Sequence, residues 1–292
     1  MCWVPGGDFL MGSEDFYPEE LPVRRVNVEG FWIDPHPVTV AEFARFVEST
    51  GYMTVGERSP DPADYPDADP ALLVPGSAVF HPTGGPVPLD SLEWWRHEPG
   101  ACWNAPEGSG SDVAGREEHP VTHVAYEDAQ AYASWVGKSL PTEAEWERAA
   151  RAGLDGARFA WGDEECPGGR WMANTWQGQF PWQNLTLDGY ARTSPIGSFP
   201  PNGYGLSDMI GNVWEWTCSA AARGGSWSES SPPCCSAPEK RAAADDRVPV
   251  IKGGSYLCAP NYCLRYRPAA RQPQTVDTST GHIGIRCVLR DA

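Results

Sequence analysis

Apolar residues recur at helical spacing in three short stretches of the chain, and a glycine closes each stretch. The first, residues 39–51, opens with a Thr-x-x-Glu capping box and places Phe43 and Phe46 on one face. The second covers about 126–135. The third, 141–153, has acidic residues in its first turn, where the helix dipole favours negative charge. These patterns predict three helices.

Shorter apolar runs predict strands at both ends of the chain. Near the N-terminus, residues 23–28 and 31–34 predict a hairpin. Near the C-terminus, residues 250–254 and 283–289 predict two further short strands. No internal repeat is evident, so the strands do not belong to a repeat architecture.

The rest of the chain is typical of long loops. Residues 56–120 and 223–247 predict loop excursions, the first rich in Pro, Gly and Asp. The sequence holds 31 Gly and 29 Pro, but also 14 Trp, and a disordered chain has few aromatic residues. We therefore expect a compact, loop-dominated protein that tryptophan side chains hold together.

Charge and apolar runs exclude two classes of partner. The net charge of −17 argues against nucleic-acid binding, which needs clustered Lys and Arg. No apolar run approaches the roughly 20 residues that a membrane span needs. The first residues lack the basic head and apolar stretch of a signal peptide, which predicts a cytoplasmic protein.

Two of the nine cysteines form a Cys258-x4-Cys263 pair in a segment rich in Gly, Pro and Asn, followed by Arg265 and Arg267. Thiolates bind soft metals, and nearby arginines favour the deprotonated form. The same spacing also suits a disulfide that closes a short loop. On spacing alone, both readings stay open.

The other candidate metal ligands are weaker. His119 and His123 share a His-x3-His spacing, but Pro120 interrupts the helix that such a pair needs, so we predict structural roles. The remaining thiols considered, at Cys2, Cys102, Cys166 and Cys218, are predicted to be inert or buried. Neighbouring cysteines rarely pair with each other, so the adjacent Cys234 and Cys235 have no physical account.

Several blocks of the sequence are similar to those of one known family. They are residues 3–12 (WVPGGDFLMG), 140–147 (LPTEAEWE), 211–216 (GNVWEW), 252–255 (KGGS) and 284–288 (GIRCV). In this order they resemble the formylglycine-generating enzyme superfamily, across nearly the whole chain. The resemblance implies a single domain over 1–292. It also implies an α+β, C-type-lectin-like fold with low regular secondary structure.

Within that superfamily, the Cys258-x4-Cys263 block resembles the active-site block of the formylglycine-generating enzymes themselves. They are copper-dependent oxidases that use O2 and a thiol reductant. Their substrate is an unfolded or nascent sulfatase polypeptide, whose Cys-x-Pro-x-Arg cysteine becomes Cα-formylglycine. The resemblance implies the same activity here, in a protein we expect to be monomeric.

The resemblance also assigns residues. Cys258 and Cys263 match the copper(I) ligands, and Ser255 and Trp214 match residues lining the oxygen and substrate pocket. Tyr262 and Arg265 match residues that orient the site, and His282 falls in the segment lining the peptide groove. Two structural calcium sites are implied, the first with Asn174, Thr175, Asp188 and Tyr190, the second with Asp208, Gly211, Val213 and Glu215. Calcium prefers such hard oxygen ligands, carbonyls included.

The chain departs from the family pattern at a few positions. Ala133, Ala150 and Pro268 replace cysteines of the structural disulfides in vertebrate relatives, so Cys287 has no inherited partner. Ala259 stands where a histidine is common. Two alternatives remain from other classes. One is a non-catalytic, lectin-like module that binds peptide or glycan, and the other is a related oxidase acting on a different thiol.

Overall fold

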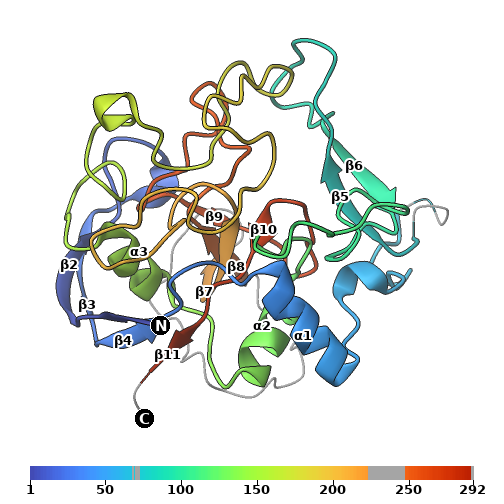
Figure 1. Ribbon diagram of the computed structural model, residues 1–292, viewed down its shortest axis with the longest axis horizontal. Coiled ribbons are helices and arrows are strands. Elements are labelled where there is room, and N and C mark those ends of the chain that lie inside the picture. Colours follow the sequence, from blue (N-terminus) through green and yellow to red (C-terminus); the bar gives the residue numbers. More distant parts are fainter. Residues whose placement is uncertain (68, 70–72, 223–246, 291–292) are drawn as a thin grey trace.

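The structure is a computed structural model, and it describes the chain except residues 68, 70–72, 223–246 and 291–292. Nearly all of the expected loop over 223–247, with Cys234 and Cys235, lies outside the described residues. Within them, short strands, short helices and long connections make an α+β fold of low regular secondary structure, as the sequence predicted (Figure 1).

The three predicted helices are confirmed as α1 (Val40–Thr50), α2 (Tyr126–Trp135) and α3 (Glu143–Arg151). The capping box before α1 forms, because Glu42 N donates to Thr39 Oγ1 (3.2 Å) and Thr39 N donates to Glu42 Oε2 (2.9 Å). Gly51 ends this helix in the left-handed conformation that glycine adopts without strain. Helices α1 and α2 lie side by side, at the end of the molecule opposite the long loops (Figure 1).

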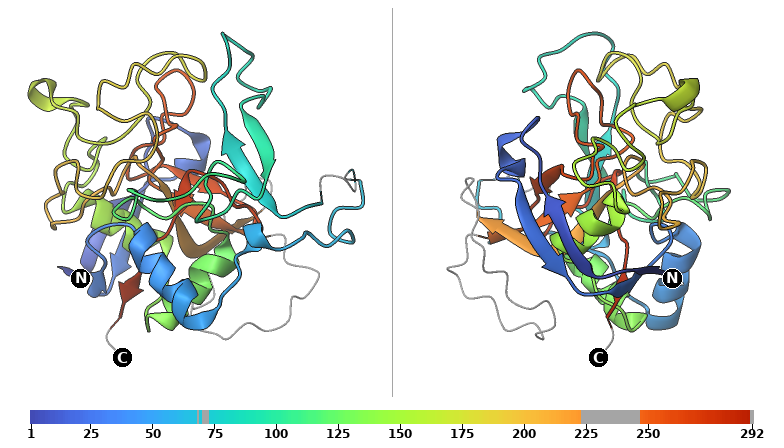
Figure 2. Two further views of the ribbon diagram at one scale, coloured as in Figure 1. Left: turned by 45° about the vertical axis from the view of Figure 1, so that its right-hand side comes forward. Right: turned by 90° about the vertical axis from the view of Figure 1, so that its left-hand side faces the viewer.

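The predicted N-terminal hairpin is wrong in its pairing. β3 (Arg24–Val28) pairs with β2 (Gly7–Met11), whereas β4 (Phe31–Ile33) lies between β1 (Cys2–Val4) and β11 (Val288–Leu289) in another sheet. Gly30 marks the crossing between the two sheets, because a Cβ there would come within 2.4 Å of the Trp3 ring. The β2–β3 hairpin packs against α3 (Figure 2).

A four-stranded sheet forms the centre of the C-terminal half, in the order β10-β7-β8-β9. Its strands are β7 (Trp214–Ala222), β8 (Arg247–Lys252), β9 (Arg271–Pro273) and β10 (Ile283–Gly284). The strand predicted over 283–289 is therefore divided: β10 pairs with β7, while β11 joins the N-terminal sheet. The chain between them turns from one sheet to the other, which apolar content alone does not reveal.

Residues 56–120 are more ordered than expected. They contain a hairpin of β5 (Gly76–Phe80) and β6 (Trp95–Pro99), while a 3-10 turn, η2 (Val55–Glu57), lies at their start. Two other 3-10 turns, η1 (Pro18–Glu20) and η4 (Pro167–Gly169), lie in loops. The Phe80 and Trp95 rings meet edge to face, 6.1 Å apart, so an aromatic pair stabilises the hairpin within a Pro- and Gly-rich segment.

Two groups of buried side chains hold these elements together. The main core includes residues of all three helices and of the N-terminal and C-terminal sheets. A smaller group, here called the aromatic cluster, consists of Phe80, Trp94, Trp176, Phe180, Tyr256, Leu257 and Ala259, with Tyr262 packed against it. The segment that carries the Cys258-x4-Cys263 pair contributes to both groups. No helix among the described residues is long and apolar enough to cross a membrane.

Candidate functional site: a buried dithiol

Cys258 and Cys263 lie side by side in the loop after β8. Backbone turns place them, because Cys258 N donates to Ser255 O (2.9 Å) and Cys263 N donates to Ala259 O (2.8 Å). The two Sγ atoms are 3.3 Å apart, and both thiols are free and buried. A disulfide needs about 2.05 Å between its sulfurs. The pair is therefore a dithiol, and the disulfide reading does not describe this structure.

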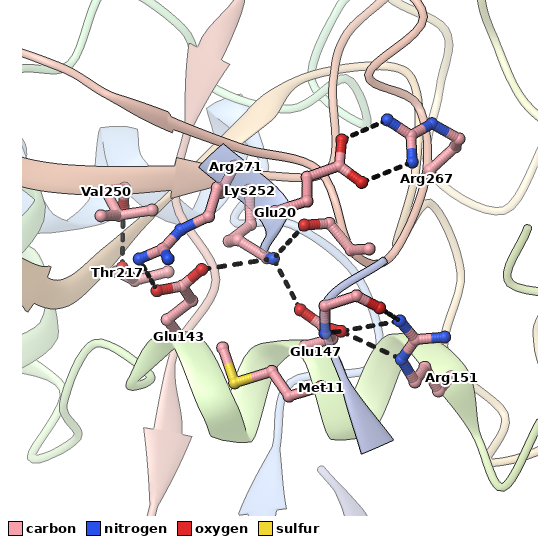
Figure 3. Close-up of polar contacts among 12 residues, drawn as sticks. Met11, Glu20, Glu143, Glu147, Arg151, Thr217, Val250, Lys252, Arg267 and Arg271 are labelled. Atoms are coloured by element: carbon pink, nitrogen blue, oxygen red, sulfur yellow. Dashed lines mark hydrogen bonds and ion pairs between the residues drawn. The ribbon is translucent and has the colours of Figure 1, made fainter. Parts of the chain in front are cut away.

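The two thiols differ in acidity. The hydrogen bond from Cys258, followed by the charge of Arg265, lowers the pKa of Cys263 to about 7, and Arg265 Nη1 lies 3.9 Å from Cys263 Sγ. Burial raises the pKa of Cys258 well above its ordinary value. Arg267, which was also expected to lower these pKa values, directs its guanidinium to Glu20 (Figure 3). Cys263 is thus the more readily deprotonated thiol.

Ser255 and Trp214 are both buried, but the structure relates them to the dithiol differently. Ser255 N lies 3.4 Å from Cys258 Sγ, so its N–H can stabilise negative charge on that sulfur. Trp214 is the first residue of β7, where its N–H donates to His282 O (2.8 Å). Its side chain belongs to the main core, which also contains both cysteines.

Tyr262 forms the outer wall of the cysteine loop. Its ring stacks on Phe180, with centroids 4.3 Å apart and planes at 4°, and meets Trp94 edge to face at 5.3 Å. Burial raises the pKa of the Tyr262 phenol to about 12, so the phenol stays protonated at neutral pH. The ring therefore adds to the contacts that Tyr256, Leu257 and Ala259 already make between the cysteine loop and the aromatic cluster.

Arg265 makes two contacts besides the one with the Cys263 sulfur. Its guanidinium lies 3.9 Å from the centre of the Tyr17 ring and forms an ion pair with Glu19. These contacts come from η1 and the residue before it, far away in sequence. The family resemblance assigned Arg265 to the site, but it gave no sign of Tyr17 or Glu19.

The histidines have structural partners. His282 Nδ1 lies 3.0 Å from Thr280 Oγ1, its ring packs on Trp95, and burial lowers its pKa to about 3, so the ring is neutral at physiological pH. His119 contacts the Thr193 hydroxyl and His123 the Ser77 hydroxyl. His119 and His123 thus contact two different hydroxyl groups, which agrees with the structural roles predicted for them.

The four residues expected at the first calcium site lie together. Asp188 Oδ2 accepts a hydrogen bond from Thr175 N (3.0 Å), and its Oδ1 accepts one from Tyr190 N (3.0 Å). The Asn174 side chain is buried, and its Oδ1 has no hydrogen-bond partner. A buried oxygen without a donor fits a cation ligand, because leaving it unpaired is costly.

The second expected calcium site fits only in part. Asp208 Oδ1 is buried without a hydrogen-bond partner, which suits a cation ligand. Glu215 differs, because Arg286 donates to both of its oxygens at 2.9–3.0 Å and Trp146 Nε1 donates to Oε2 at 2.6 Å. Gly211 N donates to Gly253 O (2.9 Å), and Val213 is buried beside Glu215. In this structure Glu215 anchors Arg286, and its oxygens are already engaged.

A buried set of charges includes Lys252, which precedes the cysteine loop in sequence, and Arg267 and Arg271, which follow it, and sequence reasoning missed it. This ion network consists of a linked group of five residues and a separate buried pair: Glu143, Glu147, Arg151, Lys252 and Arg271, and the pair Glu20–Arg267 (Figure 3). Lys252 Nζ lies 2.9 Å from Glu147 Oε2 and 3.5 Å from Glu143 Oε1, between two residues of α3. A signal was present, because Glu143, Glu147 and Arg151 follow one another at intervals of four residues and so share one face of α3.

Expectations for the other cysteines divide. Cys287 is buried and free, as the absence of its inherited partner predicted. Cys2, Cys102 and Cys166 are also free thiols. Cys218, expected to be an inert thiol, is disulfide-bonded. Among the described residues there is no group of three or more His, Cys, Asp or Glu side chains that could hold a metal ion. A metal site here would need fewer side chains, or carbonyl oxygens as well.

The fold and the site together define a protein of low regular structure, with a reduced, buried dithiol in a loop between two cores. A family model for the sulfatase-modifying factor enzyme 1-like domain matches residues 1–291. The chain belongs to this family.

Individual relatives agree with this assignment. The chain is 56% identical to the formylglycine-generating enzyme of Mycobacterium tuberculosis, over 98% of this chain and 96% of that protein. It is 37% identical to the inactive C-alpha-formylglycine-generating enzyme 2 of Bos taurus, over 98% and 87%. The structure of PvdO from Pseudomonas aeruginosa superimposes with a TM-score of 0.64 over 98% of this chain and 92% of that one, at 24% identity. That likeness concerns the fold alone.

Proposed function

We propose that this chain is a copper-dependent oxidase that converts the cysteine of a sulfatase Cys-x-Pro-x-Arg motif to Cα-formylglycine and so activates sulfatases. The single observation that carries the proposal is the free dithiol, with its sulfurs 3.3 Å apart in a buried loop. The family contains both formylglycine-generating and inactive members, so membership alone does not decide activity. The dithiol supplies the chemistry that membership leaves open.

The residues present fit a copper(I) ion. Cys258 and Cys263 would hold it, because soft thiolates are preferred ligands of copper(I). Bound copper would supply a soft, electron-rich centre for the O2 chemistry. Arg265 would offset negative charge on Cys263, and burial would keep water away from the sulfurs. Ser255 N–H would stabilise the second sulfur.

The electron balance explains the need for a reductant. Oxidation of the substrate CH2SH group to an aldehyde releases sulfide and two electrons, whereas full reduction of O2 takes up four. Two molecules of a monothiol would supply the other two electrons by forming a disulfide. The reaction thus consumes one O2 and yields one water, one hydrogen sulfide and one disulfide for each aldehyde.

Calcium would have a structural role. The first site would use Asn174, Thr175, Asp188 and Tyr190, and the unpartnered Asn174 Oδ1 supports it. The second would use Asp208, Gly211 and Val213, supported by the unpartnered Asp208 Oδ1. Glu215 would join it only by exchanging donors from Arg286 or Trp146. Chelation should lower the melting temperature, and calcium but not magnesium should restore it, because magnesium demands a smaller, water-rich site.

The remaining features of the proposal concern the working state of the protein. The family model spans residues 1–291, which supports a single domain over 1–292, and we expect the protein to act as a monomer. Among the described residues six cysteines are free thiols and Cys218 is disulfide-bonded, and the free dithiol in particular supports a reducing compartment such as the cytoplasm. The partner would be an unfolded or nascent sulfatase, because the motif cysteine must reach a buried dithiol.

The test uses copper-loaded protein, a peptide with the Cys-x-Pro-x-Arg motif, O2 and a monothiol reductant. We expect the peptide to lose its thiol and gain an aldehyde that a hydrazide captures, and we expect Cys258→Ser and Cys263→Ser to abolish this product. Cys166→Ser, a free thiol outside the dithiol, is the matched control and should keep full activity. No aldehyde with the wild type, or undiminished aldehyde with either dithiol variant, would refute the proposal. Peptides lacking the Pro or the Arg separate it from an oxidase of another thiol.

A further inference from the structure

The short segment of residues 16–20, here called the clamp segment, contacts the chain directly after Cys263. Tyr17 Oη accepts a hydrogen bond from Leu264 N at 3.0 Å. The Tyr17 ring also lies against the Arg265 guanidinium, 3.9 Å from ring centre to Cζ. One side chain thus holds the two residues that follow the more acidic sulfur.

Two carboxylates of the clamp segment extend this contact. Glu19 pairs with Arg265, and both side chains are about one-fifth to one-quarter exposed (24% and 21%). Glu20 accepts two hydrogen bonds from Arg267, one of them 2.8 Å long, and this pair is fully buried (Figure 3). The inner pair is therefore shielded from solvent. The outer pair lies nearer to solvent and next to the residues beside the sulfur.

The chain just before the clamp segment is hydrogen-bonded to a helix. Gly12 N donates to Glu147 Oε1 (2.8 Å), and Gly12 O accepts from Arg151 Nη2 (2.9 Å), both residues being in α3. Ser13 N donates to Glu20 O (3.3 Å), which closes the loop between Gly12 and η1. Hydrogen bonds at Gly12 and Ser13 thus join both α3 and the clamp segment to the same stretch of chain.

We propose that Tyr17 and Glu19 are positioning residues of the dithiol site, which hold Leu264 and Arg265 so that Cys263 Sγ stays beside Cys258 Sγ. This inference rests on the proposed function in treating the dithiol as the working site. Pre-organisation is its physical basis: two sulfurs already held together lose less conformational entropy when one ion or atom bridges them. Neither side chain would touch the bridging atom.

The experiment measures two bridging reactions of the full-length protein. The first is copper(I) affinity, by competition with a chromogenic chelator. The second is affinity for phenylarsine oxide, which forms two As–S bonds with a dithiol and releases one water, without copper or turnover. The variants are Tyr17→Phe, which removes only the acceptor for Leu264 N, and Glu19→Gln. Glu14→Gln is the matched control, because Glu14 is an exposed acid of the same N-terminal loop.

We expect Tyr17→Phe and Glu19→Gln each to weaken both affinities roughly five- to tenfold, the scale of one lost hydrogen bond, at unchanged melting temperature. Glu14→Gln should match the wild type. Wild-type affinities in both variants, or losses that only follow a lower melting temperature, would overturn the inference. If the wild type binds no copper(I) but the variants bind phenylarsine oxide more weakly, the proposed function fails and the positioning role stands.

Discussion

The two sides of the cysteine loop are held by different physical means. The ion network fixes Lys252 and Arg267, which flank the loop in sequence, with buried charges, while Tyr262 within the loop stacks on Phe180 of the aromatic cluster. Buried charges tolerate no missing partner, because an uncompensated charge in the interior is very costly. Ring contacts are spread over many weak interactions and lose strength gradually. The ion network should therefore determine whether the loop folds, and the contacts of Tyr262 should determine how active the site is.

Removing Lys252, the central cation of the ion network, should have the largest effect. Lys252→Met leaves Glu143 and Glu147 facing each other without their shared partner, and we expect the free energy of unfolding to fall by about 3–5 kcal/mol in urea titrations. Lys138→Met is the matched control, because its ion pair with Asp34 is partly exposed and should be worth less than about 1 kcal/mol. Equal losses of unfolding free energy in the two variants would show that the ion network stabilises the protein no more than a partly exposed ion pair does.

Truncating Tyr262 should reduce stability less and enzymatic activity more. Tyr262→Ala removes the ring that joins the loop to Phe180 and Trp94, and we expect to lose about 2 kcal/mol of unfolding free energy. The rate of aldehyde formation should fall at least tenfold, because the loop loses its outer wall. Tyr262→Phe keeps the stack and should match the wild type in urea titrations. A Tyr262→Ala protein with full activity would remove the functional half of the comparison.

Local signals predicted the helices and the site cysteines, but not the surroundings of the site. The capping box at Thr39 depends on residues within a few positions of each other, so sequence spacing suffices. Spacing also identified the Cys258-x4-Cys263 pair, but it left a disulfide and a metal site both open until the family resemblance and the sulfur separation of 3.3 Å were considered. Contacts across the chain are different. Glu19 reaches Arg265 over 246 positions, and neither residue's spacing indicates the other. The partners of the two N-terminal strands failed for the same reason, because alternation identifies a strand without identifying its neighbour.

The stability that the ion network contributes should also depend on pH. Burial alone would raise the pKa of Glu147, but the charges of Lys252 and Arg151 outweigh it and hold the pKa below the usual 4.5. A carboxyl with a lowered folded-state pKa stabilises the protein fully above its unfolded-state pKa, and that contribution is lost as the pH falls through the folded-state value. We expect unfolding free energies measured from pH 6 to pH 3 to decline below about pH 4.5, and Glu147→Gln to flatten this decline. Glu48→Gln, at an exposed site on α1, should leave the curve unchanged.

The smallest expected effect concerns the thiol of Cys263. In copper-free protein, alkylation of Cys263 by iodoacetamide, followed by peptide mass spectrometry, should rise with pH around a midpoint of about 7, while Cys258 lags because burial raises its pKa. Arg265→Met should shift that midpoint upward, by less than about one pH unit, since Arg265 ranks behind the Cys258 hydrogen bond as a cause.

Glu19 complicates this measurement, because it loses its partner in Arg265→Met and would itself raise the pKa of a nearby thiol. The double variant Arg265→Met/Glu19→Gln removes both charges and isolates the contribution of the guanidinium. A midpoint that stays near 7 in the double variant would assign the acidity of Cys263 to Cys258 alone. Arg265 and Glu19 would then shape the site through packing and not through charge.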